Sequence, residues 1–136
     1  MDWQQCLNAK NVKRSIYDIN LIKSLIKTSE NKLKSQEKLE IDNITANSKI
    51  SLAYDSLREL LEALAIKNGY KIYNHECYTY FLKEIILNSY FGDEFDIIRR
   101  VRNDINYYGR EINMEEAKSL IRKIINLRSL ISNLLI

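Results

Sequence analysis

The chain contains no proline and only three glycines, Gly69, Gly92 and Gly109, each of which follows a stretch where apolar residues recur every three or four positions. Proline breaks helices, and glycine is the residue most often found in the left-handed turn that ends one. The glycines therefore predict three helix ends. No stretch alternates apolar and polar residues with the period of a strand, so we expect no sheet.

Candidate N-caps complete the division into helices. Asn113 stands three residues before Glu116, as in a capping box, and Asn74 and Asp93 occupy similar places before apolar runs. The predicted helices lie near residues 13–39, 47–68, 75–91, 94–108 and 114–135. They predict an all-α, up-down bundle of about five helices that forms a single domain over residues 1–136.

Helical spacing also predicts which faces are buried. The second predicted helix carries one apolar stripe, formed by Ile50, Ala53, Tyr54, Leu57, Leu60, Leu61 and Leu64. In the fourth, projection at about 100° per residue places Ile98, Val101, Ile105 and Tyr108 on the core face. In the last, apolar residues cover more than one stripe, which indicates either a central position or a dimer interface.

Composition excludes several classes of protein. No run of about 18 uncharged apolar residues and no secretory leader pattern is present, so we expect a cytoplasmic protein. Cys6 and Cys77 lie far apart without metal-binding spacing, which predicts neither a zinc site nor a disulfide, and nothing indicates a cofactor or metal. A net charge of +3 means that any RNA contact must come from a local cluster.

The segment from Arg99 to Gly109 carries the one chemical signal. On a helix it presents a polar stripe beside the core face, with a phenol at its end: Arg99, Arg102, Asn103, Asn106 and Tyr107. A guanidinium flanked by amides and a phenol suits a phosphate group, because each of them can donate a hydrogen bond. The alternative is an ordinary solvated helix face, whose arginines pair with Asp96 and Asp104.

The stretch from Arg102 to Gly109, the histidine His75 at the start of the third predicted helix and the helix order resemble the HEPN superfamily. The resemblance spans roughly residues 15–132. It implies a helical bundle, often a homodimer, whose signature is an Arg, a polar residue and then a His four to six residues after the Arg. Arg102 and Asn103 match the opening of that signature.

In catalytic HEPN proteins the Arg and His of two protomers cut RNA without a metal and leave a cyclic phosphate. Here Tyr107 stands at the place of that His, and no histidine follows it. A tyrosine phenol ordinarily titrates near pH 10, so it is a poor base at neutral pH, although it can donate a hydrogen bond to phosphate. His75 is the only histidine, and its place matches a histidine that is architectural in the family.

Three hypotheses follow. The leading one is a nucleotide- or RNA-associated binding module, without efficient nuclease activity, whose partner is a nucleotidyltransferase in a toxin–antitoxin-type pair. The second is a metal-independent endoribonuclease that uses Arg102 with Tyr107 or His75. The third is a structural dimer-forming interaction protein, in which carboxylates engage Arg102 and keep it from other ligands.

Overall fold

The computed structural model describes residues 1–136, and 72% of the chain is helical. In chain order the elements are α1 (Trp3–Asn8), β1 (Val12–Arg14), α2 (Ile19–Lys38), α3 (Ala46–Lys67), β2 (Tyr70–Ile72), α4 (Glu76–Tyr80), the π-helical turn η1 (Phe81–Ile85), α5 (Ser89–Tyr108) and α6 (Met114–Asn133). The all-α fold class predicted from the sequence is confirmed. None of the helices is both long and apolar enough to cross a bilayer.

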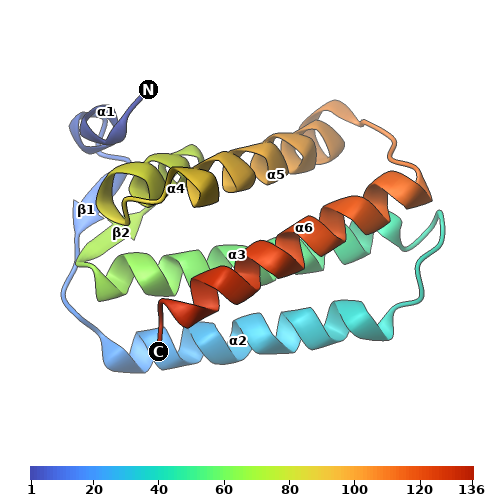
Figure 1. The fold of residues 1–136 in the computed structure, drawn as a ribbon, viewed down its shortest axis with the longest axis horizontal. Coiled ribbons are helices and arrows are strands. Elements are labelled where there is room, and N and C mark those ends of the chain that lie inside the picture. The colour runs from blue at the N-terminus through green and yellow to red at the C-terminus, as the bar shows by residue number, and fades with distance from the viewer.

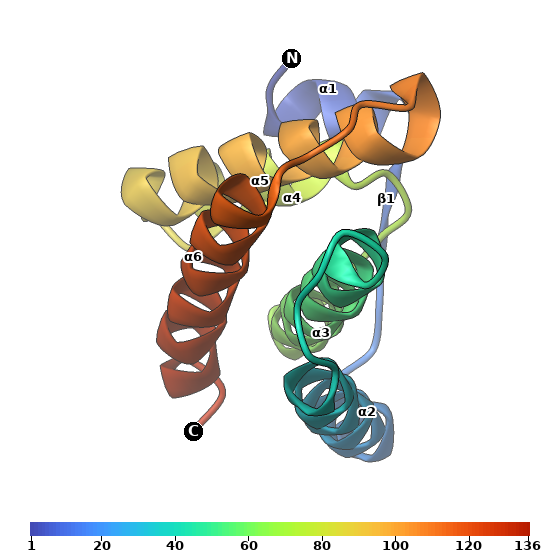
Figure 2. The same cartoon turned by 90° about the vertical axis from the view of Figure 1, so that its right-hand side faces the viewer.

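The long helices are arranged around α3. α2 and α3 run side by side in opposite directions, and α6 also packs on α3 (Figure 1). α5, reached through α4 and η1, lies across the top of this group, while α1 and the two strands close one end (Figures 1 and 2). Consequently α3 contacts every other long helix.

The core follows the length of α3. Its seven-residue apolar stripe from Ile50 to Leu64 is buried, as the helical spacing predicts. Burial of one such aliphatic side chain contributes about 1.5–3 kcal/mol. α6 uses most of its wide apolar surface inside the chain, burying Leu120, Ile121, Ile124, Leu127 and Ile131. Of the two explanations for that surface, a central position therefore accounts for most of it.

The prediction that the chain forms no sheet is wrong at one place. β1 and β2 pair antiparallel, with Val12 opposite Ile72 and both side chains buried. Strands of three residues are too short to show alternation, and partners far apart in the sequence leave no hairpin turn to recognise. The first long helix accordingly begins later than predicted, at Ile19, where the Asp18 carboxylate accepts a hydrogen bond from the Leu21 amide at 3.0 Å.

The prediction that the cysteines form no disulfide is also wrong. Cys6 and Cys77 are bonded, with their Cα atoms 6.1 Å apart and both side chains fully buried. The bond joins α1 to α4, two residues after His75. Trp3 packs beside it against Tyr70, with ring centroids 5.1 Å apart. Spacing along the chain could not predict this pair, because tertiary packing alone brings α1 to α4.

Of the three helix ends predicted at glycines, two are confirmed: Gly69 and Gly109 adopt positive φ angles of +88° and +65°. The prediction is wrong for Gly92, which lies inside a helix. The third predicted helix stops earlier, at the π-helical turn, and α5 has already begun before Gly92. Its N-cap is Asn88, which accepts a hydrogen bond from the Phe91 amide at 3.1 Å, and not Asp93 as predicted. Asn113, in contrast, caps α6 and bonds Glu116 as predicted.

Close packing explains the glycine at position 92. A Cβ atom there would lie 2.5 Å from Cγ of Lys83 and 3.0 Å from the carbonyl oxygen of Thr79. We expect Gly92→Ala to lower the free energy of unfolding by about 1–2 kcal/mol, because overpacking outweighs the better helix propensity of alanine. Urea unfolding monitored by circular dichroism measures this change. Equal or greater stability of the variant would show that the Lys83 side chain can move aside without lowering the free energy of unfolding.

Candidate functional site

Arg102 lies on the side of α5 that faces α3. Ile98 and Ile105, one turn before and after it, are both buried, and residues three or four apart share a helix face. The guanidinium lies over the ring of Tyr54 on α3, with Cζ 4.8 Å from the ring centroid. A cation at this distance is attracted by the negative face of the ring. Arg102 is therefore held at the edge of the core and is only partly exposed.

Tyr54 also contacts His75, which directly precedes α4. The tyrosine hydroxyl lies 3.1 Å from Nδ1 of the histidine. Tyr54 is fully buried, and this burial raises the pKa of its phenol to about 12, so the hydroxyl keeps its proton at neutral pH. We assign the tyrosine as the donor of this hydrogen bond, with Nδ1 of the histidine as the acceptor. Arg102 and His75 therefore both contact the buried side chain of Tyr54, which was predicted from the sequence to lie in the core.

His75 is neutral at physiological pH. Burial, reinforced by the positive charges of Arg58 and Arg102, lowers the pKa of His75 from 6.5 to about 4. With Nδ1 assigned as the acceptor of the tyrosine hydrogen bond, the single proton of the neutral ring is on Nε2. That N–H group makes no hydrogen bond within the chain. The histidine therefore offers the site an uncharged donor.

A single carboxylate engages the two neighbouring arginines on α5. Oδ1 of Asp96 lies 2.8 Å from Nη2 of Arg99, and Oδ2 lies 2.9 Å from Nε of Arg100. Burial raises the pKa of Asp96, but the hydrogen bond and charge of Arg99 outweigh it, so the pKa lies below its ordinary value. For Arg99 and Arg100, the ion-paired alternative considered from the sequence describes what the structure shows. Nε of Arg99 remains buried without a hydrogen-bond partner.

Arg99, Arg100 and Arg102 of α5 form a cluster with a fourth arginine, Arg58 of α3, whose charge also acts on Tyr54. Arg58 lies one turn after Tyr54 and pairs with Glu62 at 3.3 Å and with Asp55 at 3.9 Å. Of the four arginines, only Arg102 forms no ion pair with a carboxylate. Its charge is the one that remains available to a ligand.

The remaining predicted site residues lie around Arg102. With its amide oriented to suit its neighbours, the Asn106 side-chain oxygen accepts a hydrogen bond from Nε of Arg102 at 2.9 Å. The Tyr107 ring is 69% exposed, with its centroid 5.9 Å from Cζ of Arg102. The Asn103 side chain is partly exposed and has no hydrogen bond within the chain. The structure thus gathers Arg102, Asn106 and Tyr107, while Arg99 is directed to Asp96.

Tyr108, predicted on the core face of this helix, is 81% exposed. The buried stripe of α5 ends at Ile105, and the helix itself ends at Tyr108 before the left-handed Gly109. Val101, predicted on the same face, is only partly buried. The predicted core face therefore holds for Ile98 and Ile105, which are buried, and for Val101, which packs against the core, and it is wrong only for Tyr108 at the end of the helix.

Two residues of this site were not predicted from the sequence. Tyr54 was predicted to lie in the core but not to contact Arg102, and Arg58 was not predicted to take part. Arg58 follows Tyr54 by four residues and stands directly after Leu57 of the apolar stripe. A charged residue beside an apolar stripe, one turn from a tyrosine, was the signal that could have identified both.

Comparison with known proteins adds no identification. No family model matches the chain, and neither a curated protein nor a solved structure is significantly similar to it. No three metal-ligating side chains lie close enough together to hold an ion.

Proposed function

We propose that the chain is a HEPN-like binding module that takes the phosphate group of a nucleotide or RNA at Arg102. One observation carries this proposal: Arg102 and His75 converge on Tyr54, and Arg102 has no carboxylate partner. The guanidinium of Arg102, the exposed Tyr107 hydroxyl and Nε2 of His75 are the groups that could donate hydrogen bonds to the oxygens of a phosphate group there. The third hypothesis, a purely structural protein, requires Arg102 to be engaged by carboxylates, and that engagement is not found.

Binding is favoured over cleavage by the protonation state of the histidine. A pKa of about 4 leaves His75 uncharged at neutral pH, so it cannot serve as a general acid, and it is a weak base. Efficient acid–base catalysis needs a group that titrates near the working pH. The neutral imidazole is nevertheless a good hydrogen-bond donor for a phosphate oxygen.

A metal-independent endoribonuclease remains the second candidate, and one observation favours it. That hypothesis requires Arg102 and a substitute for the missing histidine to lie together, and Arg102 and His75 both contact Tyr54. A bound phosphate would supply the negative charge that raises the pKa of His75 toward the working range. Tyr107 is the other substitute, and its hydroxyl would act from the exposed side of Arg102.

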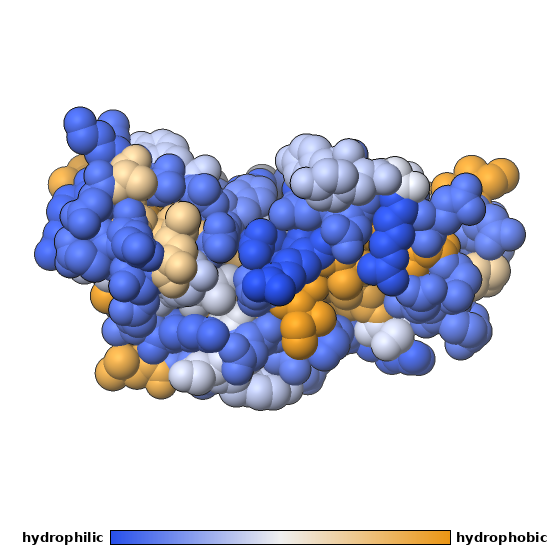
Figure 3. All heavy atoms as spheres, turned by 90° about the horizontal axis from the view of Figure 1, so that it is seen from above, coloured by the Kyte–Doolittle hydropathy of each residue, from blue (hydrophilic) through white to orange (hydrophobic).

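Partners and location remain part of the proposal. The resemblance to HEPN proteins supports a homodimer and a nucleotidyltransferase partner, and the cytoplasmic location rests on the apolar pattern of the sequence. On the face formed by α1, α4 and α5, exposed hydrophobic atoms lie in a strip among hydrophilic ones (Figure 3). A groove of about 450 Å³ between α5 and α6 includes Ile97, which is 48% exposed, Val101 and Leu120. Molecular mass in solution tests whether a second copy covers this groove.

We expect the Arg102→Ala variant to bind AMP and a short single-stranded RNA at least about tenfold more weakly than the native protein, because a charged hydrogen-bonding pair to phosphate is lost. The matched control is Arg100→Ala, which removes the same residue type from the same helix where the side chain is 72% exposed. Titration followed by the NMR signal of His75, the only histidine, measures both affinities.

The same samples separate the candidate functions. The binding module predicts weaker binding in the Arg102 variant and no RNA cleavage in EDTA by either protein. Cleavage by the native protein that Arg102→Ala and His75→Gln both abolish would establish the endoribonuclease instead. Equal affinity of Arg102→Ala and native protein, without cleavage, would refute the phosphate site.

A further inference from the structure

β1 and β2 form a short ribbon at one end of the bundle (Figure 1). Lys13 of β1 stands directly opposite Lys71 of β2 in the antiparallel register. The inner face of the ribbon is buried through Val12 and Ile72. Side chains alternate between the two faces along a strand, so both lysines lie on the outer face. Like charges directly opposite one another destabilise a strand pair, and an anion bound between the lysines would relieve that repulsion.

An exposed aromatic ring lies beside these lysines. Tyr73 follows Lys71 by two residues and therefore shares the outer face. Its amide donates to the carbonyl of Asn11 at 2.8 Å, which extends the ribbon by one pair. The ring centroid is 5.7 Å from Nζ of Lys13 and 5.8 Å from Nζ of Lys71, and the residue is 54% exposed. The outer face thus presents one aromatic ring and two ammonium groups.

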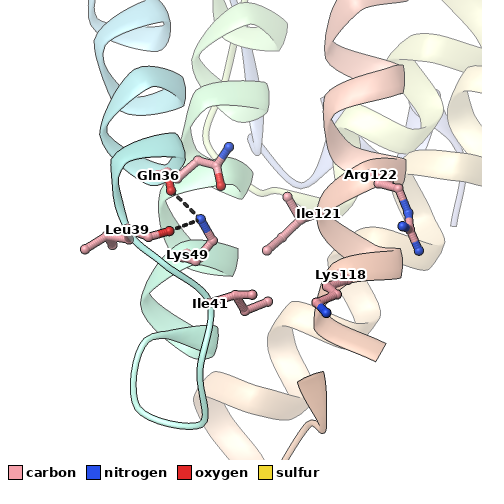
Figure 4. A pocket seen from close by; sticks show the side chains of 7 residues that line it. All are labelled: Gln36, Leu39, Ile41, Lys49, Lys118, Ile121 and Arg122. Carbon is pink, nitrogen blue, oxygen red and sulfur yellow. Dashed lines mark hydrogen bonds between the residues drawn. The ribbon is translucent and has the colours of Figure 1, made fainter. Parts of the chain in front are cut away.

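No carboxylate balances the charge of this surface. Residues 3–17 and 63–75, which include both strands, contain no Asp or Glu. Two more exposed cations, Lys10 and Arg14, belong to the first of these segments, and none of the four cations forms an ion pair. Lys49 is the contrast, because its ammonium group donates to backbone carbonyls at the end of α2 and is not available to a ligand (Figure 4).

We propose that this ribbon surface, formed by Lys10, Lys13, Arg14, Lys71 and Tyr73, binds single-stranded nucleic acid. A base stacks on the Tyr73 ring, and the phosphates on either side of that base contact the ammonium groups of Lys13 and Lys71. An acidic peptide or an anionic lipid surface would match the charge, but neither offers a planar base to the ring. The surface shares no residue with the Arg102 cluster, so it goes beyond the phosphate site proposed above and is tested separately.

Octauridylate without terminal phosphates is the probe. We expect it to shift the amide NMR signals of Lys13, Lys71 and Tyr73 in ¹⁵N-labelled protein and to saturate. A heptaglutamate peptide with blocked ends, which has a comparable charge but no bases, should bind at least about fivefold more weakly. Absence of saturable shifts at these residues, or equal affinity for the peptide, would overturn the proposal.

A first pair of variants tests the charges. Lys13→Gln combined with Lys71→Gln should weaken octauridylate binding at least about tenfold. It should also reduce the slope of log affinity against log salt concentration by about 1.4, because two phosphate contacts are lost. The matched control, Lys27→Gln combined with Lys38→Gln, removes two exposed lysines from α2 and should leave both quantities unchanged. Native affinity in the ribbon variant, or an equal loss in the control, would contradict a site built from these charges.

A second pair tests the ring. Tyr73→Phe should keep the native affinity, whereas Tyr73→Leu should lower it at least about fivefold without changing the salt dependence, because only the stacking surface is lost. Equal affinity of the two variants would refute stacking on Tyr73. AMP, followed at the His75 signal, should bind Lys13→Gln, Lys71→Gln protein as tightly as native protein, so failure of the ribbon surface and failure of the Arg102 site are distinguishable.

Discussion

Reduction of the disulfide between Cys6 and Cys77 is expected to lower the free energy of unfolding by about 4 kcal/mol. The bond closes a loop between residues 71 positions apart, and closing a loop of this length restricts the unfolded chain by about that amount. It also holds α1 against α4, where both sulfurs are fully buried. Guanidinium unfolding with and without a reducing agent measures the difference.

The control for this experiment is a chain that cannot form the bond. A Cys6→Ala, Cys77→Ala double variant should show the reduced stability in both conditions. Coincident unfolding of the oxidised and reduced native protein would disprove the stabilising role of the bond. Because disulfides are rare in a reducing cytoplasm, a strong dependence would also argue against the cytoplasmic location proposed from the sequence.

A second large effect concerns the titration of His75. In the folded protein its pKa lies at about 4, whereas an unfolded histidine titrates near 6.5. Above pH 6.5 both states are neutral at this residue, and stability does not depend on it. As the pH falls from 6.5 to 4, only the unfolded chain binds the proton, so the free energy of unfolding decreases. A His75→Gln variant should lose this part of the acid sensitivity.

The same titration tests the arrangement around Tyr54. The ring proton signals of the single histidine report its pKa directly in NMR spectra recorded from pH 3 to 8. Arg102→Ala should raise the pKa of His75, because a positive charge that opposes protonation is removed. Arg100→Ala, which is not among the charges acting on His75, should leave it unchanged. Titration of the native residue near its ordinary value would mean that His75 is solvated and separate from the cluster.

The helices with continuous apolar spacing were predictable from the sequence. α3 shows this best, because every residue of its predicted stripe is buried. The Asn113 cap of α6 was also predictable, since its hydrogen bond to the Glu116 amide is local in sequence. What could not be predicted depends on contacts between distant segments. The pairing of β1 with β2 and the bond from Cys6 to Cys77 both join the N-terminal segment to residues that follow α3.

The candidate site was predictable only in part, for a related reason. Local spacing identified Arg102, Asn106 and Tyr107 as neighbours, and the structure brings these three together. Local spacing could not show that Asp96 would hold Arg99, since one carboxylate can pair with any of several nearby arginines. It also could not reveal Tyr54, whose position under Arg102 is set by how α5 crosses α3.

The pairing of the arginines also limits the kind of ligand that suits the cluster. Arg58, Arg99, Arg100 and Arg102 face Asp55, Glu62 and Asp96, so three of the four positive charges are already matched. With one charge left over, binding would release about one counterion, and affinity would fall only gently with added salt. A site of this kind recognises a single phosphate group in a fixed geometry. It lacks the electrostatic reach to follow the backbone of a long nucleic acid.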